Sequence, residues 1–234
     1  QKQKQHFDVI ETGWSKVDPL FPIVSKPIGT IPTIMIASTF TERLSLAYID
    51  VVYNTIRTLS LSGNYNFKMV LHPKIPQYLV EKWKCLNGAN FTFYNTTDLI
   101  PLFKDSDILF ADTTSAIQEF LLQKKPVVTY NHTLKHNYLI QICEANAIES
   151  AFEKAVSNPK ELAINIERYI SELHPYSDGK SSARVVSSTI SFLQKEKSYL
   201  KPKPINLIRK FKIRKRLRHF TFKSFRLPKF NTSC

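Results

Sequence analysis

The chain has 234 residues, of which 43% are hydrophobic and 22% charged, and its formal net charge is +14. This length allows one large domain or two small ones, and the composition is that of an ordinary globular protein. No run of 18 apolar residues is present, which excludes a helical membrane span, and no signal peptide opens the chain. Because the first residue is Gln, we expect the sequence to be a piece of a longer protein.

Residues 1–32 contain four prolines and are predicted to be a linker segment that leads into a domain. After it, short apolar runs alternate with segments of helical periodicity. The predicted strands are 33–38, 66–71, 90–94, 108–111 and 126–130, and the predicted helices are 45–61, 76–86, 98–104, 115–124, 144–157, 159–173 and 181–195. This alternation is typical of parallel strands with crossover helices. We therefore predict an α/β domain with a Rossmann-like parallel sheet over 33–198, followed by a basic amphipathic tail over 199–234.

The positive charge is concentrated in this tail. Residues 201–234 contain twelve Lys or Arg and no acidic residue, while residues 1–200 contain 21 basic and 19 acidic residues. The basic character therefore belongs to the tail and not to the predicted domain. The three cysteines and six histidines have no metal-like spacing, so we expect no metal or cofactor, and the scattered cysteines indicate a reducing compartment.

Polar residues follow each predicted strand, at the edge where ligands bind to open parallel sheets. Thr39 follows the first strand and His72 the second, where the imidazole could act as an acid, a base or a donor to phosphate. The remaining residues of this kind are Asn95, Thr96, Asp112, Thr113, Thr114, Ser115, Asn131 and His132.

The turn after the fourth strand has the most specific pattern. Thr113, Thr114 and Ser115 place three hydroxyls at the predicted start of a helix, where unpaired backbone N–H groups favour an anion such as phosphate. Glu119 follows one helical turn later and could accept hydrogen bonds from the two hydroxyls of a ribose. An ordinary helix cap followed by a glutamate would give the same pattern, so both interpretations stay open.

Five segments carry a family resemblance. They are GWSKVDPLF at 13–21, STF at 38–40, LHP at 71–73, SDILFADTTS at 106–115 and DGKSSARV at 178–185. In order and spacing they resemble motifs of the CDP-glycerol glycerophosphotransferases, the family of teichoic-acid polymerases and primases. The resemblance extends over residues 13–195.

The resemblance implies a glycosyltransferase-B architecture, in which two Rossmann-like halves enclose the active site, with this chain as the C-terminal, nucleotide-binding half. The family transfers glycerol phosphate from CDP-glycerol to a lipid-linked acceptor and releases CMP, at the cytoplasmic face of the membrane. The implied partners are therefore this donor or another nucleotide-linked donor, the acceptor, and the N-terminal half of the same enzyme. Because a second catalytic histidine of the family lies in that N-terminal half, the isolated chain is expected to be inactive or nearly so.

Positions in the motifs assign the candidate site residues. His72 falls on an active-site histidine of the family, Thr114 and Ser115 fall on serines that approach the donor phosphates, and Arg184 falls on a late arginine. Together with the strand-end pattern, this makes His72 the candidate catalytic residue. The candidate substrate-binding residues are Thr39, Asp112, Thr113, Thr114, Ser115, Glu119 and Arg184.

The sequence also departs from the family. Thr-Thr-Ser replaces Tyr-Ser-Ser at 113–115, and Ala183 replaces the usual Glu. Residues 115–119 also resemble a ribose-phosphate segment of nucleotide-sugar epimerases and related transferases, so the donor could be a nucleotide sugar. A non-catalytic Rossmann-like module that binds an anionic polymer is a further alternative.

The basic tail combines cations with aromatic and aliphatic residues. On a helix, Leu207, Ile208 and Phe211 would share one side, which suits an anionic membrane surface bound through residues 201–234. We therefore expect a cytoplasmic protein at the inner face of the cell membrane and no nucleic acid as partner. RNA binding and a solvated, disordered tail remain the alternatives.

Overall fold

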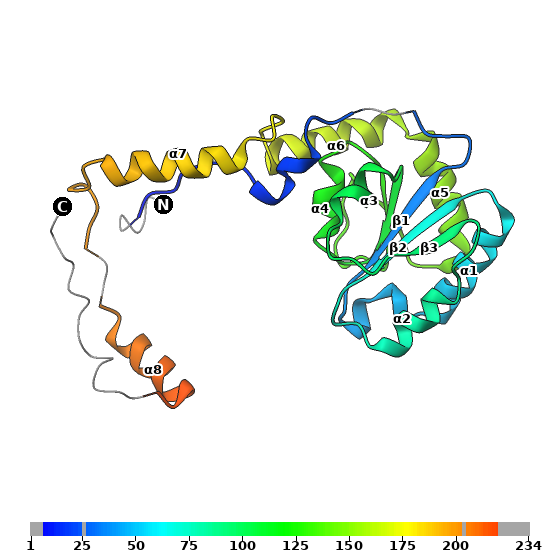
Figure 1. Cartoon of the computed structure of the whole chain (residues 1–234), viewed down its shortest axis with the longest axis horizontal. Coiled ribbons are helices and arrows are strands. Elements are labelled where there is room, and N and C mark those ends of the chain that lie inside the picture. Colours follow the sequence, from blue (N-terminus) through cyan, green and yellow to red (C-terminus); the bar gives the residue numbers. More distant parts are fainter. Residues whose placement is uncertain (1–6, 25–26, 203–204, 220–234) are drawn as a thin grey trace. The chain divides into compact units, whose positions relative to one another are not determined.

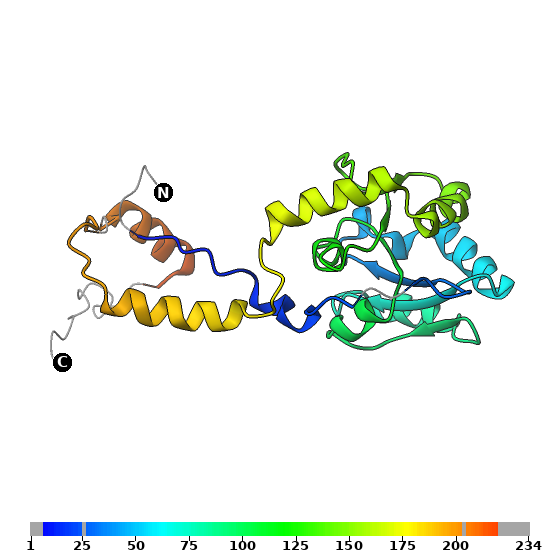
Figure 2. The ribbon, with the colours of Figure 1, turned by 90° about the horizontal axis from the view of Figure 1, so that it is seen from above.

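The computed structural model of the chain describes residues 7–24, 27–202 and 205–219. The chain divides into two units (Figures 1 and 2). One unit comprises residues 12–190 and carries the sheet, and the other comprises residues 1–11 and 191–234. The last part of the predicted membrane-binding tail, residues 220–234, lies outside the described residues.

The sheet has six parallel strands in the order β3-β2-β1-β4-β5-β6. They are β1 (Thr33–Ser38), β2 (Asn66–Leu71), β3 (Phe91–Phe93), β4 (Ile108–Ala111), β5 (Val127–Tyr130) and β6 (Ile140–Ile142). This confirms the predicted α/β fold with its parallel sheet. The sixth strand was not predicted, because three residues at a sheet edge are too short to show a periodicity.

The helices lie close to their predicted positions. They are α1 (Asp50–Ser62), α2 (Gln77–Lys84), α3 (Ile100–Lys104), α4 (Ala116–Leu121), α5 (Ile148–Ser157), α6 (Lys160–Leu173) and α7 (Ser181–Gln194). Several predicted helices were too long, and the helix predicted at 144–157, for example, begins only at Ile148, after the 3-10 segment Ala145–Ala147. Helix α1 begins only at Asp50, after two short 3-10 segments, and α4 ends at Leu121 because the chain turns at Lys124, whose φ is +61°.

Helices cover both faces of the sheet (Figure 1). The chain crosses from β1 to β2 and β3 in one direction, and from β3 to β4 and β5 in the other, so right-handed crossovers place α1 and α2 opposite α3 and α4. Helix α5 lies on the same face of the sheet as α1 and α2. Its Phe152 ring packs against the rings of Phe67 in β2 and Phe110 in β4, at centroid distances of 6.2 and 5.3 Å. On the other face, Phe103 of α3 contacts Phe120 of α4.

The strand order reverses between β1 and β4, which are neighbours in the sheet. The loops that leave these two strands turn to opposite faces, and in such sheets a crevice opens between them at the carboxyl ends. The polar residues that follow β1 and β4 therefore flank this crevice.

Residues 12–32 belong to the same unit as the sheet. They include the 3-10 helix η1 (Ser15–Leu20), whose Val17 and Leu20 are buried in the core. The segment predicted as a linker thus contributes apolar side chains to the domain and brings its polar residues close to it.

The other unit contains the helix α8 (Leu207–Leu217). Near the chain's beginning, Asp8 accepts a hydrogen bond from Tyr199 and lies 3.6 Å from the ammonium group of Lys195. Within the described ranges, no helix is long and apolar enough to span a membrane.

Candidate functional site

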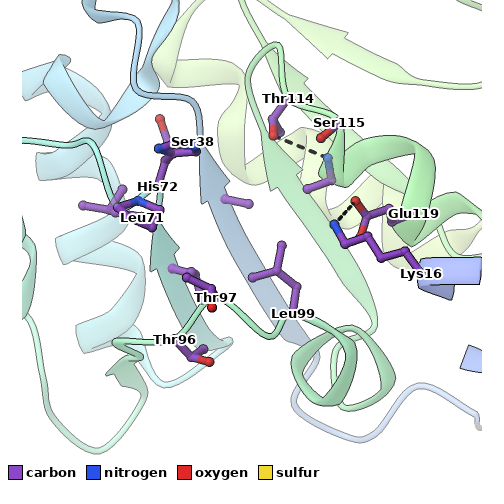
Figure 3. Close-up of a pocket in the computed structure, with 14 residues that line it drawn as sticks. Lys16, Ser38, Leu71, His72, Thr96, Thr97, Leu99, Thr114, Ser115 and Glu119 are labelled. Carbon is purple, nitrogen blue, oxygen red and sulfur yellow. Dashed lines mark hydrogen bonds and ion pairs between the residues drawn. The ribbon is translucent and has the colours of Figure 1, made fainter. Parts of the chain in front are cut away.

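A pocket of about 360 Å³ opens at the carboxyl ends of the strands (Figure 3). Its wall combines the segment before the sheet, the ends of β1 and β2, the loops after β2 and β3, the turn after β4, and helix α4. The polar residues that line it are Lys16, Ser38, His72, Thr96, Thr97, Thr114, Ser115 and Glu119. The pocket lies at the reversal of strand order, where open α/β sheets bind their ligands.

His72 occupies the first position of a turn after β2. Its carbonyl accepts a hydrogen bond from the N–H of Ile75 at 2.9 Å, and Pro73 holds the backbone angle that the second position of such a turn requires. The N–H of Lys74 donates to His72 Nδ1 at 3.1 Å. Since Nδ1 accepts this bond, the proton of the neutral imidazole lies on Nε2. The exposed ring of His72 therefore offers an N–H donor.

The turn after β4 supplies two hydroxyls to the pocket (Figure 3). Thr114 Oγ1 accepts a hydrogen bond from the N–H of Ala116 at 3.4 Å, which leaves its hydroxyl hydrogen available for a ligand. Ser115 is exposed. Because α4 has only six residues, its dipole is weaker than the predicted helix would provide. The hydroxyls are the stronger feature of this turn.

Glu119 is a buried carboxylate whose side chain is only 2% exposed. Its Oε1 accepts a hydrogen bond from Lys16 Nζ at 2.6 Å, whereas its Oε2 has no hydrogen-bond partner among the described residues. A buried carboxylate oxygen without a donor is costly, which favours a ligand that supplies one. Lys16 was not predicted as a site residue. The only sequence signal was its place in the 13–21 motif.

Asp112 lies outside the lining of the pocket and is fully buried. Burial raises the pKa of its carboxyl group, while hydrogen bonds to the carboxylate oppose this rise. The donors are Ser38 Oγ at 2.5 Å, the N–H of Thr39 at 3.0 Å and the N–H of Leu46 at 3.0 Å. Both carboxylate oxygens are thus occupied by protein groups, and Asp112 ties the loop after β1 to the end of β4.

The other predicted substrate-binding residues also lie outside this lining. Thr39 contacts Asp112 through its backbone, and Thr113 Oγ1 is buried without a hydrogen-bond partner among the described residues. Arg184 forms an ion pair with Asp178, and its guanidinium group lies 3.7 Å from the centre of the Tyr176 ring. The structure therefore brings together His72, Thr114, Ser115 and Glu119, but not Thr39, Asp112, Thr113 and Arg184.

The first and last of the five sequence motifs contact each other. Asp18 accepts hydrogen bonds from the N–H groups of Ser181 and Ser182 at 2.9 and 2.7 Å, at the beginning of α7. Gly179 has a φ of +65°, and a Cβ at this position would lie 2.9 Å from the carbonyl oxygen of Asp18. These residues hold the segment that carries Lys16 against the end of the domain.

Replacing Asp18 with asparagine tests this contact through its pH dependence. Burial alone would raise the pKa of Asp18, but hydrogen bonds from Ser182 and Ser181 outweigh it and lower the pKa from 3.8 to about 2. The contribution of the ionised Asp18 carboxylate to the stability of the fold is therefore complete above pH 3.8 and is lost as the pH falls toward 2. We expect the variant to be less stable than the wild type at about pH 6, and the difference to shrink below about pH 4, measured by urea denaturation. A difference that is constant with pH would contradict this.

Comparisons with known proteins give a fold and no family. No family model matches the chain, and no curated protein matches it. Among solved structures, a protein described as a UDP-N-acetylglucosamine 2-epimerase from Listeria monocytogenes has 17% identity and a TM-score of 0.52, over 82% of this chain and 56% of that one. The H444N variant of the wall teichoic acid polymerase TagF has 15% identity and a TM-score of 0.56, over 79% and 52%.

The fold is a Rossmann-like fold of the glycosyltransferase-B type. The structure of TagF without a substitution has the same fold over 76% of this chain, with 14% identity and a TM-score of 0.53. The chain spans about half the length of these structures, since it covers 56%, 52% and 47% of them.

Proposed function

We propose that the chain is the nucleotide-binding, C-terminal half of a glycosyltransferase-B enzyme that transfers glycerol phosphate from CDP-glycerol to a lipid-linked polymer acceptor. The main observation is that a single pocket at the reversal of strand order unites His72, the Thr114–Ser115 hydroxyls and the buried carboxylate of Glu119. The choice of CDP-glycerol as donor and of a lipid-linked polymer as acceptor comes from the motif resemblance over residues 13–195. The fold shared with TagF is consistent with both.

In this proposal the donor diphosphate lies on the turn after β4, where Thr114 and Ser115 donate hydrogen bonds to its oxygens. The ribose hydroxyls donate to Glu119, whose Oε2 has no hydrogen-bond partner within the described part of the chain. Lys16, whose ammonium group lies 2.6 Å from Glu119 Oε1, adds a positive charge beside the phosphates.

The chemical step is a phosphoryl transfer. An acceptor hydroxyl oxygen forms a bond to the glycerol-bearing phosphorus, the bond from that phosphorus to CMP breaks, and the hydroxyl proton passes to a base. Because positioning and charge stabilisation dominate such reactions, His72 contributes by donating its Nε2–H to a phosphate oxygen. The base then comes from the other half of the enzyme.

Titration calorimetry on the chain tests the nucleotide site. We expect CDP-glycerol and CDP to bind without turnover, because the chain carries only one half of the active site. Replacing Glu119 with alanine is expected to weaken binding about tenfold, since the ribose loses its charged acceptor. Glu161→Ala is the matched control for nucleotide binding, because Glu161 is exposed on α6 and does not line the pocket. Absence of nucleotide binding would refute the proposed site, and robust turnover of CDP-glycerol would refute the proposed division of the active site.

A nucleotide sugar is the second candidate donor. Residues 115–119 resemble the ribose-phosphate segment of nucleotide-sugar epimerases, and the structural match from Listeria monocytogenes is described as such an epimerase. The same calorimetric series with UDP and UDP-N-acetylglucosamine distinguishes the donors, because the preferred nucleotide binds more tightly.

Helix α8 supports the proposed location at the inner face of the cell membrane. Leu207 and Ile208 are 68% and 75% exposed, and Phe211 lies on the same side of the helix. The helix also carries six Lys or Arg and no acidic residue. Exposed apolar side chains among cations suit the surface of an anionic bilayer, where each cation contributes about 1 kcal/mol.

Truncation after Leu200 tests the membrane proposal. We expect the full chain to float with vesicles that contain anionic lipid and the truncated chain to remain behind, because the truncation removes all twelve tail cations. Vesicles of neutral lipid serve as the control. Equal flotation of both chains would contradict the proposal, as would binding to RNA without binding to anionic vesicles.

A further inference from the structure

A second cavity of about 420 Å³ lies beside the first, and we call it the imidazole pocket. Thr114 and Ser115 line both cavities, so the two meet at the turn after β4. The rest of its polar lining comes from Thr113 of the same turn, from α4, from the loop between β5 and β6, and from α6. The residues used below are Gln118, His132, His136, Tyr138 and Tyr169.

Aromatic rings form a continuous row of contacts along this pocket, edge-to-face between His132 and His136 and stacked beyond them. His132 and His136 are 5.4 Å apart between ring centroids, and His136 stacks on Tyr138 at 4.8 Å. Tyr138 in turn stacks on Tyr169 of α6 at 3.8 Å. These contacts pack the loop between β5 and β6 against α6, so the pocket has an aromatic side.

The imidazole pocket is lined by hydroxyl, amide and imidazole groups and by apolar side chains. Among the described residues, no Lys, Arg, Asp or Glu lines it. Burial and the neighbouring His132 lower the pKa of His136, which keeps its imidazole neutral at pH 7. His132 Nδ1 lies 2.9 Å from the carbonyl oxygen of Leu134, so its Nε2 is the nitrogen left for a ligand.

This chemistry selects a class of ligand. A phosphate would find no cation in the pocket to compensate its charge. The neutral imidazole of His136, the Gln118 amide and the Ser115 hydroxyl can each donate and accept hydrogen bonds, which matches the hydroxyls of a sugar or polyol. The aromatic side provides the apolar surface that small-molecule sites combine with a few polar groups.

We propose that the imidazole pocket binds the uncharged, polyhydroxylated group attached to the diphosphate of the donor. The two cavities meet at Thr114 and Ser115, so a diphosphate on this turn directs the nucleoside into the first cavity and the glyceryl or sugar group into the second. This inference rests on the proposed nucleotide site. His132 and His136 are its specificity-determining residues.

Imidazole NMR signals of the full chain test this directly, because His72 reports on the first cavity and His132 and His136 on the second. We expect CDP and UDP to shift the signal of His72 and to leave the other two unchanged. A donor with its group attached is expected to shift all three. The comparison of CDP-glycerol with CDP, and of UDP-N-acetylglucosamine with UDP, identifies whether the group is a glyceryl or a sugar.

Replacing His136 with glutamine is expected to weaken binding of the matching donor about tenfold and to leave binding of the bare nucleotide unchanged. Lys135→Gln is the matched control, since this exposed neighbour does not line the pocket. If donors shift only His72, or if CDP alone shifts His136, the inference fails while the nucleotide site stands. If no nucleotide shifts His72, both fail.

Discussion

Replacing Asp112 with alanine is expected to lower the free energy of unfolding by about 3 kcal/mol or more. The variant leaves the N–H groups of Thr39 and Leu46 without their acceptor, while the Ser38 hydroxyl loses one partner and keeps Ser45 Oγ at 2.7 Å. Each buried donor without a partner costs about 1–3 kcal/mol, and water can recover only part of this sum. Urea denaturation of the wild type and the variant measures the difference.

Asp105→Ala is the matched control for this prediction. The Asp105 side chain is 60% exposed, and its carboxylate lies 3.6 Å from Lys68 Nζ. An exposed pair of this kind contributes less than about 1 kcal/mol, so the control is expected to stay close to the wild type. Equal stability of the Asp112 variant and the control would show that Asp112 does not tie the loop after β1 to the sheet.

Replacing His72 with alanine is expected to lower turnover about 100-fold in the complete enzyme, in which both halves are present. The N–H of Lys74 donates to Nδ1, so in the proposed mechanism the imidazole presents Nε2–H to the donor phosphates. We therefore expect His72→Gln, whose amide also carries an N–H donor, to retain more activity than His72→Ala. Steady-state rates of the two variants measure this.

The pair of His72 variants separates two roles of the imidazole. If His72 were the general base, glutamine would be as damaging as alanine, because an amide cannot take up the proton. Equal loss in both variants would therefore refute the donor role, and unchanged rates would remove His72 from the mechanism altogether. Lys135→Gln serves as the control, since this exposed residue lines neither pocket.

The architecture of the sheet could be predicted because each strand carries its own signal. Strands such as Ile108–Ala111 are buried on both sides and read as continuous apolar runs, with turn residues and amphipathic helices between them. The edge strand Ile140–Ile142 lacks this signal, since it has three residues and is only partly buried. Helix ends were less predictable, because the backbone angle of Lys124 stops α4 without a Gly or Pro at that position.

The sequence by itself determined the alternation of strands and helices, and it placed His72, Thr114, Ser115 and Glu119 at the edge of the sheet where the pocket opens. Only the tertiary structure decided which polar residues line the pocket. Asp112 and Ser115 follow the same strand, yet one is buried against backbone donors and the other is exposed. Lys16 reaches Glu119 from 103 residues away in the chain. The pattern of neighbouring residues predicts whether a residue is buried within its own helix or strand. The partner of a polar side chain depends instead on strand order and loop packing, which the neighbouring residues do not predict.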